Sequence, residues 1–104
     1  MSRIVIRPQA HRDIDDQFRH LSGQSIDLAL RFFDAVHATI KRLAASPDLG
    51  ITYEFRSRRL KGIHWWKVRG FRNHLVFYRA IAGGIEVVRI LHATRDIPSA
   101  FRDN

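Results

Sequence analysis

The chain has no cysteine among its 104 residues. It therefore cannot form a disulfide, a thiolate zinc site or a cysteine nucleophile. It also lacks the run of about 18 apolar residues that a membrane-spanning helix requires, and its first residues lack the apolar core of a signal peptide. These absences predict a cytoplasmic protein that does not associate with membranes.

Sequence motifs for cofactors and metals are also missing. We find no glycine-rich phosphate loop and no G-x-S-x-G elbow, and the histidines do not show the spacing of metal ligands. The histidines are His11, His20, His37, His64, His74 and His92. The sequence therefore predicts no cofactor and no metal.

Acidic residues are scarce in the second half of the chain. Residues 1–55 hold 7 basic and 7 acidic side chains, whereas residues 56–104 hold 11 basic and only 3 acidic ones, which accounts for the whole net charge of +8. Of the 18 cations, 15 are arginine, the residue suited to bidentate recognition of phosphate or carboxylate. The second half is therefore expected to meet an acidic partner, although a solvated basic face would show the same composition.

Enough apolar residues are present to build a core. The composition is 45% hydrophobic and 11% aromatic, which excludes global disorder. A chain of this length has room for one core. We therefore expect a single domain over residues 1–104.

The first half predicts a strand and two helices. Residues 3–7 are rich in β-branched side chains, and helical periodicity follows over residues 8–21, with Pro8 in the first turn. Ser25 is a candidate N-cap for a second helix, which ends in the turn signal of residues 46–50. The main apolar stripe of the second helix is predicted to comprise Ala29, Phe33, Val36, Ile40 and Leu43, widened by Leu28 and Phe32. Asp13, Asp15 and Asp16 are expected on a solvated face of the first helix.

The second half predicts strands over residues 58–63, 65–69, 75–81 and 85–91. The predicted fold is α+β, in the order β-α-α-β-β-β, with an antiparallel sheet and an N-terminal helical hairpin packed on one face. Gly83 and Gly84 indicate a two-residue turn. That turn would place Tyr78 opposite Arg89 and Leu75 opposite His92. It would also put Arg79 on the face of His92, and Tyr78 on the face of His74.

Two of the predicted strands carry apolar residues at both odd and even positions. Residues 75–78 and 87–91 carry apolar side chains toward both faces of the sheet, which is unusual for an antiparallel sheet with one wet face. The C-terminal tail or another protein chain must cover the second face. In the tail, Ile97, Ala100 and Phe101 could form a last helical turn.

Cations and aromatic side chains alternate along the strand of residues 65–69. Trp65, Lys67 and Arg69 share one face, and Trp66 and Val68 share the other. Such a face can stack on bases and neutralise phosphates, or anchor a protein interface. Trp66 fits better as a core residue, whereas Trp65 fits the core and the surface equally.

The basic half also offers groups for phosphate chemistry. A ribonuclease needs a base for the ribose 2′-hydroxyl, a cation at the phosphate and an acid for the leaving oxygen. The candidates for these roles are His92, His64, Lys67 and Arg79. The same residues also suit a purely structural sheet, in which Tyr78 and Arg89 would be an ordinary cross-strand pair.

Three segments carry a resemblance to a known family. Residues 71–79, 84–92 and 95–97, with their FYR, IEVVRILH and RDI signatures, resemble the last hairpin and tail of toxins in the RelE/ParE superfamily, in its ParE branch. The first strand, the helix that begins at Pro8 and the loop of residues 47–50 also match. The resemblance covers nearly the whole chain.

This resemblance implies the toxin of a type II toxin–antitoxin pair, in a heteromeric complex with a ParD-like antitoxin whose acidic C-terminal segment wraps the toxin. ParE-like toxins are expected to trap DNA gyrase on broken DNA without catalysing a reaction. RelE-like relatives are instead ribosome-dependent mRNA endoribonucleases. His64 and Lys67 depart from the ParE pattern and add titratable groups, but the tail after His92 has no tyrosine to complete a RelE-like set.

Three functions therefore stay open at the level of sequence. They are a non-enzymatic gyrase inhibitor, which is the leading interpretation, an mRNA endoribonuclease, and a non-toxic basic module that binds nucleic acid. The residues expected to contact the target or the antitoxin are Trp65, Lys67, Arg69, Arg72, Tyr78, Arg79, Arg89, His92 and Arg95.

Overall fold

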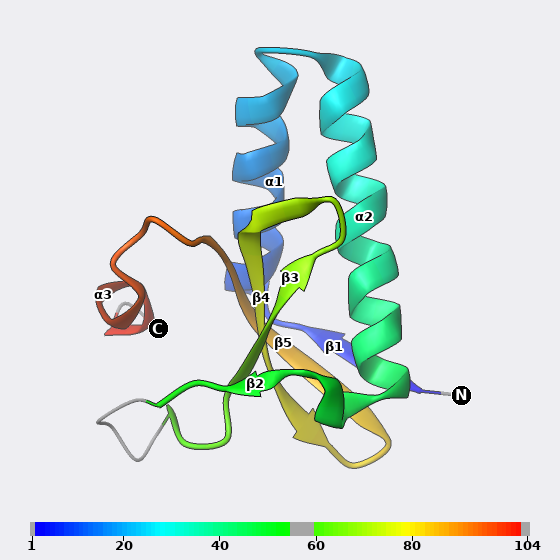
Figure 1. Ribbon diagram of the computed structural model, residues 1–104, viewed down its shortest axis with the longest axis vertical. Coiled ribbons are helices and arrows are strands. Elements are labelled where there is room, and N and C mark those ends of the chain that lie inside the picture. The colour runs from blue at the N-terminus through cyan, green and yellow to red at the C-terminus, as the bar shows by residue number, and fades with distance from the viewer. Residues whose placement is uncertain (1, 55–59, 103–104) are drawn as a thin grey trace.

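A helical hairpin follows the first strand and precedes the rest of the sheet, as predicted. The computed structural model describes residues 2–54 and 60–102, and Figure 1 shows their arrangement. The elements are β1 (Arg3–Ile6), α1 (Pro8–Ser22), α2 (Ile26–Ala45), the 3-10 turn η1 (Pro47–Leu49), β2 (Ile51–Thr52), β3 (His64–Val68), β4 (Phe71–Ile81), β5 (Gly84–His92) and α3 (Ile97–Arg102).

One predicted strand is wrong. The described part of residues 58–63 forms a turn, and residues 58–59 lie outside the described residues. The edge strand is instead the short β2, which pairs with β3. Gly62 has a φ of 87°, so the chain reverses there and cannot continue as a strand.

The two helices begin where the capping residues predict. Pro8 occupies the first turn of α1, and the backbone N–H of Leu28 donates to Ser25 Oγ at 3.2 Å at the start of α2. The stripe of α2 differs by one position, because Phe32 is fully buried whereas Phe33 is 42% exposed. Phe32 lies three residues after Ala29 and four before Val36, so it stays on the buried face of the helix.

The sheet has the order β1-β5-β4-β3-β2. All neighbours are antiparallel except β1 and β5, which run parallel. The sheet is therefore mixed, which corrects the expectation of a wholly antiparallel one. Gly84 permits this pairing, because a Cβ at Gly84 would collide with the backbone of Arg3.

The register of the β4–β5 hairpin also differs from the prediction. Its two turn residues are Ala82 and Gly83, with Gly83 at a φ of 79° and Ile81 paired with Gly84. A bulge between Phe77 and Tyr78 shifts the register once more.

The cross-strand pairs change accordingly. The predicted pairing of Tyr78 with Arg89 is wrong, because Tyr78 pairs with Val87 and Arg89 with Phe77. The predicted pairing of Leu75 with His92 is also wrong, because His92 pairs with His74. Arg79 consequently does not share a face with His92. Tyr78 and His74 do share the face toward α2, where Tyr78 joins the core around Phe32 and the His74 ring lies 4.9 Å from that of Phe32.

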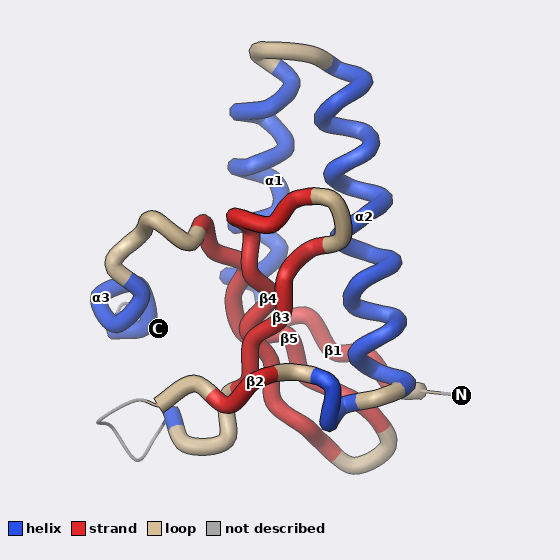
Figure 2. The backbone as a smooth tube through the Cα atoms, viewed as in Figure 1, coloured by secondary structure: helices blue, strands red, loops and turns tan. Residues whose placement is uncertain are grey.

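Both faces of the sheet are buried. The face toward α1 and α2 packs Val76, Tyr78 and Ile90 against Phe32 and Ile40. The other face is covered by α3, which lies away from the hairpin in Figure 2. Ile97, Ala100 and Phe101 form this cover together with Phe77, Val88 and Leu91. Of the two predicted covers, the C-terminal tail is therefore present, and the predicted last helical turn is confirmed.

An ion pair joins α1, β5 and α3. The Arg89 guanidinium donates to both carboxylate oxygens of Asp13, at 2.7 and 2.9 Å, and to the carbonyl of Ala100 at 2.6 Å. Asp13 also accepts the N–H of Ile90 at 2.9 Å. Because Asp13 is only 8% exposed and Arg89 only 2%, the prediction of a solvated Asp13 is wrong.

Among the helices of the described chain, none is both long and apolar enough to cross a bilayer.

Candidate functional site

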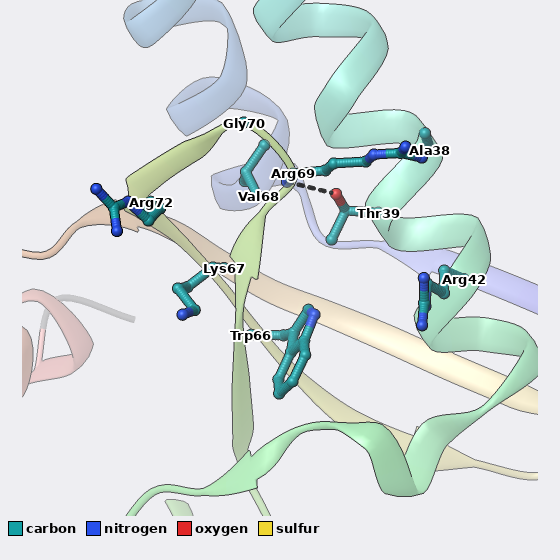
Figure 3. Close-up of a pocket in the computed structure, with 9 residues that line it drawn as sticks. All are labelled: Ala38, Thr39, Arg42, Trp66, Lys67, Val68, Arg69, Gly70 and Arg72. Carbon is teal, nitrogen blue, oxygen red and sulfur yellow. Dashed lines mark hydrogen bonds between the residues drawn. The ribbon is translucent and has the colours of Figure 1, made fainter.

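An open groove lies between the second half of α2 and the β3–β4 turn (Figure 3). It has a volume of about 560 Å³ and contains four cationic side chains and no acidic one. We call it the basic groove, and its lining residues are Ala38, Thr39, Arg42, Trp66, Lys67, Val68, Arg69, Gly70 and Arg72.

A hydrogen bond from the sheet to α2 shapes the basic groove. The backbone N–H of Arg69 donates to Thr39 Oγ1 at 3.1 Å, and that hydroxyl donates to the carbonyl of Ala35 at 2.7 Å. Gly70 then takes a φ of 78°, which turns the chain into β4. Since Thr39 is buried, this contact holds the turn at a defined place beside α2.

The cations of the basic groove are spread across two elements. Figure 3 shows Arg42 and Trp66 on the α2 side of β3, Arg69 reaching toward Ala38, and Lys67 and Arg72 on the other side of the strand. All four cations are exposed. Within the described ranges none of them makes a salt bridge. Their N–H donors are therefore available to anionic oxygen atoms.

The predicted binding residues divide into two groups. Lys67, Arg69 and Arg72 all line the basic groove. Arg69 points toward α2, whereas Lys67 lies on the other side of β3 (Figure 3), so the predicted face shared by Trp65, Lys67 and Arg69 is wrong. Trp66 packs against the main core, as predicted, and it also lines the basic groove. Trp65 instead packs against the core on the α3 side of the sheet.

Arg42 was missed by sequence reasoning, because it lies in the helical half whose net charge is zero. A local pattern in the sequence could have indicated Arg42. It follows Thr39 by three residues, which places both side chains on the same face of a helix.

Two predicted binding residues lie in the core. Tyr78 is fully buried, donates to the carbonyl of Pro47 at 2.7 Å and accepts the N–H of Gly50 at 2.8 Å. Burial raises the pKa of the Tyr78 hydroxyl above its ordinary value. Arg89 is held by Asp13 as described above. Neither side chain is available to a partner of the folded protein.

The four candidate catalytic residues do not converge. His64 stacks on Tyr78 with ring centroids 5.7 Å apart, and Arg79 Nε lies 3.8 Å from Glu86 Oε1. His92 Nδ1 lies 2.7 Å from the hydroxyl of Thr94. His64 and His92 pair with positions of β4 that are four residues apart, or roughly 13 Å along a strand. The fourth candidate, Lys67, lies in the basic groove.

His74 and His92 are adjacent at one end of the sheet. Their ring centroids lie 5.0 Å apart, and the His74 ring packs on Phe32 and Phe71. Burial lowers the pKa of His74, and the nearby imidazoles of His92 and His20 lower it further.

The remaining predicted binding residue, Arg95, is exposed beyond β5. Residues 2–54 and 60–102 contain no group of three or more His, Asp or Glu side chains that could hold a metal ion.

Comparison with known proteins gives one family match. The family described as the ParE toxin of the type II toxin–antitoxin system, parDE, matches residues 4–97. This chain belongs to the ParE toxin family. The resemblance predicted from the sequence is therefore confirmed. The match covers both long helices and, apart from the first residue of β1, every strand of this ParE-family chain.

Solved structures show the same fold at low sequence identity. One, from the chromosomal ParDE toxin–antitoxin system of P. aeruginosa, is 16% identical with a TM-score of 0.71, covering 88% of this chain and 96% of that chain. Another, from the YoeB–YefM complex of Staphylococcus aureus, is 15% identical with a TM-score of 0.55, covering 88% of this chain and 97% of the other. No curated protein matches the sequence.

Proposed function

We propose that this protein is a toxin that acts on DNA gyrase, traps it on broken DNA and catalyses no reaction itself. The observation that carries the proposal is the ParE family match over residues 4–97. The placement of the catalytic candidates supports it, since His64 and His92 pair with positions of β4 that are four residues apart, and Arg79 lies by Glu86. A general acid and base must both reach the reacting atoms, and a scattered set cannot do so.

We also propose that a ParD-like antitoxin holds the toxin inactive in a heteromeric complex. One structural neighbour comes from a ParDE toxin–antitoxin system, and another comes from a two-protein complex, YoeB–YefM. The chain presents an apolar row that a partner segment would cover. In it, Ile26, Leu30 and Phe33 of α2 are 59%, 52% and 42% exposed, and their spacing places them on one side of the helix.

The target surface in this proposal consists of exposed cations. The predicted residues Lys67, Arg69, Arg72 and Arg95 remain in it, because all four are exposed. Arg79 and His92 lie at its margins, since each is half-buried. We leave out Tyr78, Arg89 and Trp65, which contribute to the two cores.

The test combines purified protein with gyrase and supercoiled plasmid. Inhibited supercoiling or trapped cleaved DNA is expected, and added antitoxin should restore turnover. Normal gyrase turnover at large molar excess of the protein would contradict the gyrase proposal. Cut transcripts on translating ribosomes, abolished by His92→Ala, would favour the endoribonuclease instead.

A pair of variants tests the role of the apolar row. Leu30→Lys should still inhibit gyrase but should need at least tenfold more antitoxin for rescue. Ile51→Lys is the matched control, because Ile51 is 49% exposed on β2, outside the row. Equal rescue of both variants would place the antitoxin elsewhere.

A further inference from the structure

We propose that the basic groove binds one phosphodiester strand of a nucleic acid directly, through Arg42, Lys67, Arg69 and Arg72. This inference goes beyond the proposed function, which concerns a protein target and a protein partner. It does not depend on either of them, because the binding can be measured with the chain and an oligonucleotide alone.

The first support is uncompensated charge. The groove brings four cations together, and no carboxylate lines it. Several cations elsewhere in the described chain pair with acids, as Arg7 and Arg79 do with Glu86 and Arg31 with Asp27. Four exposed cations around one hollow repel one another, and an anionic ligand relieves that repulsion.

The second support is the way these charges are spread. The cations run from Arg42 on α2 past Arg69 at the turn to Lys67 and Arg72 on the hairpin (Figure 3). A single phosphate ion would be bound by donors that converge on one point. A line of donors instead matches the repeated charge of a polyanion.

The third support is the shape of the groove and its aromatic wall. The volume of about 560 Å³ is that of a small-ligand pocket, which has room for part of one strand but not for a duplex. The Trp66 side chain lines the groove on the α2 side of β3, which is the side of Arg42 (Figure 3). Base stacking on an aromatic side chain beside a basic track is a feature of single-strand binding.

An acidic peptide is the competing occupant, and the distribution of apolar residues disfavours it. Stable peptide docking needs apolar anchor positions. The large apolar side chains that are exposed in the described chain are Ile4, Ile26, Leu30, Phe33 and Ile51. None of them lines the basic groove.

Fluorescence anisotropy with a labelled oligothymidine tests the inference, using a strand of about 12 nucleotides, within the usual range of single-strand sites. Arg42→Gln combined with Arg72→Gln should raise Kd at least tenfold. The double variant should also reduce the slope of log Kd against log salt by about 1.4, which corresponds to two lost phosphate contacts. The control is Arg12→Gln with Lys41→Gln, which removes the same charge from exposed positions of α1 and α2 outside the groove and should leave Kd within about twofold. Thermal melts should show all these proteins folded.

The two tryptophans provide a second readout. In Trp65→Phe the remaining Trp66 lies in the groove, whereas in Trp66→Phe the remaining Trp65 lies on the opposite face of the sheet. Unlabelled oligothymidine should quench the fluorescence of the first variant and leave that of the second unchanged. This readout does not require the loss of any cation.

Several results would overturn the inference. They are an equal loss of affinity in the control variant, duplex binding as tight as single-strand binding, equal quenching of both tryptophan variants, and displacement of the oligonucleotide by an equimolar oligoglutamate peptide. A preference between DNA and RNA of one sequence would support strand recognition and identify the source of the strand. Because the assay contains no gyrase, its failure would leave the gyrase proposal standing.

Discussion

Tyr78 connects the end of the helical hairpin to the sheet. Its hydroxyl bonds to Pro47 and Gly50 in the segment that leads from α2 to β2. Gly50 lies so close to this hydroxyl that a Cβ there would collide with it. One buried phenol therefore fixes the path of the chain between the two layers.

Removing that hydroxyl should cost stability. In Tyr78→Phe the Pro47 carbonyl and the Gly50 N–H, both of half-buried residues, lose their partner. The expected cost is about 1 kcal/mol, the low end of the range for an unsatisfied buried polar group. Urea denaturation should show a lower midpoint at an unchanged m-value. A midpoint equal to that of the parent protein would mean that solvent replaces both hydrogen bonds.

His74 should make folding sensitive to mild acid. Burial and the neighbouring imidazoles lower its pKa in the folded state below the ordinary value of 6.5. Between the two pKa values the unfolded state binds more protons, so the free energy of unfolding falls as the pH drops through 6.5 and stops falling below the folded-state pKa. Above that window the group contributes nothing to the pH dependence.

Denaturation curves between about pH 7.5 and 5 measure this effect, since they span the range in which histidine titrates. His74→Gln should flatten the pH dependence, and His92→Gln should weaken it, because His92 is the larger of the two charge effects on His74. An unchanged slope in His74→Gln would assign the acid sensitivity to other groups.

Helix α1 is joined to β5 and α3 through the Asp13–Arg89 pair. Both side chains are buried, and each makes hydrogen bonds beyond the pair itself. A buried ion pair adds little net stability when intact, but removal of one partner leaves an isolated charge. The pair therefore acts mainly as a constraint on how the three elements pack.

Asp13→Ala should destabilise the fold by about 3–5 kcal/mol, the range for breaking a buried pair. Asp13→Ala combined with Arg89→Met should be less destabilising than the sum of the two single changes. The reason is that Arg89→Met removes the guanidinium charge that Asp13→Ala leaves without a partner. A double-mutant cycle in urea measures this coupling. Strict additivity would show that water or another group solvates the remaining charge. Asp15→Ala, at an exposed position of the same helix, is the control and should change stability by less than about 0.5 kcal/mol.

The molecule presents two chemically different surfaces. The apolar row begins at the start of α2, and the basic groove lies beside its second half. An antitoxin that covers the row and a nucleic acid that enters the groove need not exclude each other. The charge of +8 favours encounter with both an acidic segment and a nucleic acid.

Binding of the antitoxin should raise the thermal stability of the toxin. At a free antitoxin concentration 100 times Kd the gain is about 2.7 kcal/mol, provided that only the folded toxin binds. Calorimetry of the toxin with rising antitoxin should show Tm increasing with concentration, and Leu30→Lys should reduce that increase. A Tm that does not respond to antitoxin would contradict the proposed complex.

Local signals in the sequence were enough to predict the helical hairpin, the strand–turn–strand character of the second half, the division of charge and the family. Periodicity, Pro8 and the Ser25 cap act within a few residues, so the chain itself carries that information. The motifs of the last hairpin are likewise contiguous. The order of the elements followed from them.

Only the tertiary structure decided the register of β4 and β5, the burial of Asp13 and which residues line the basic groove. Asp13 and Arg89 are 76 residues apart in sequence, and the bulge beside Tyr78 changes every pairing beyond it. Arg42 joins Arg69 and Arg72 only because Thr39 holds the β3–β4 turn against α2. Such long-range contacts depend on how the elements pack together, and no pattern within a short stretch of chain specifies that packing.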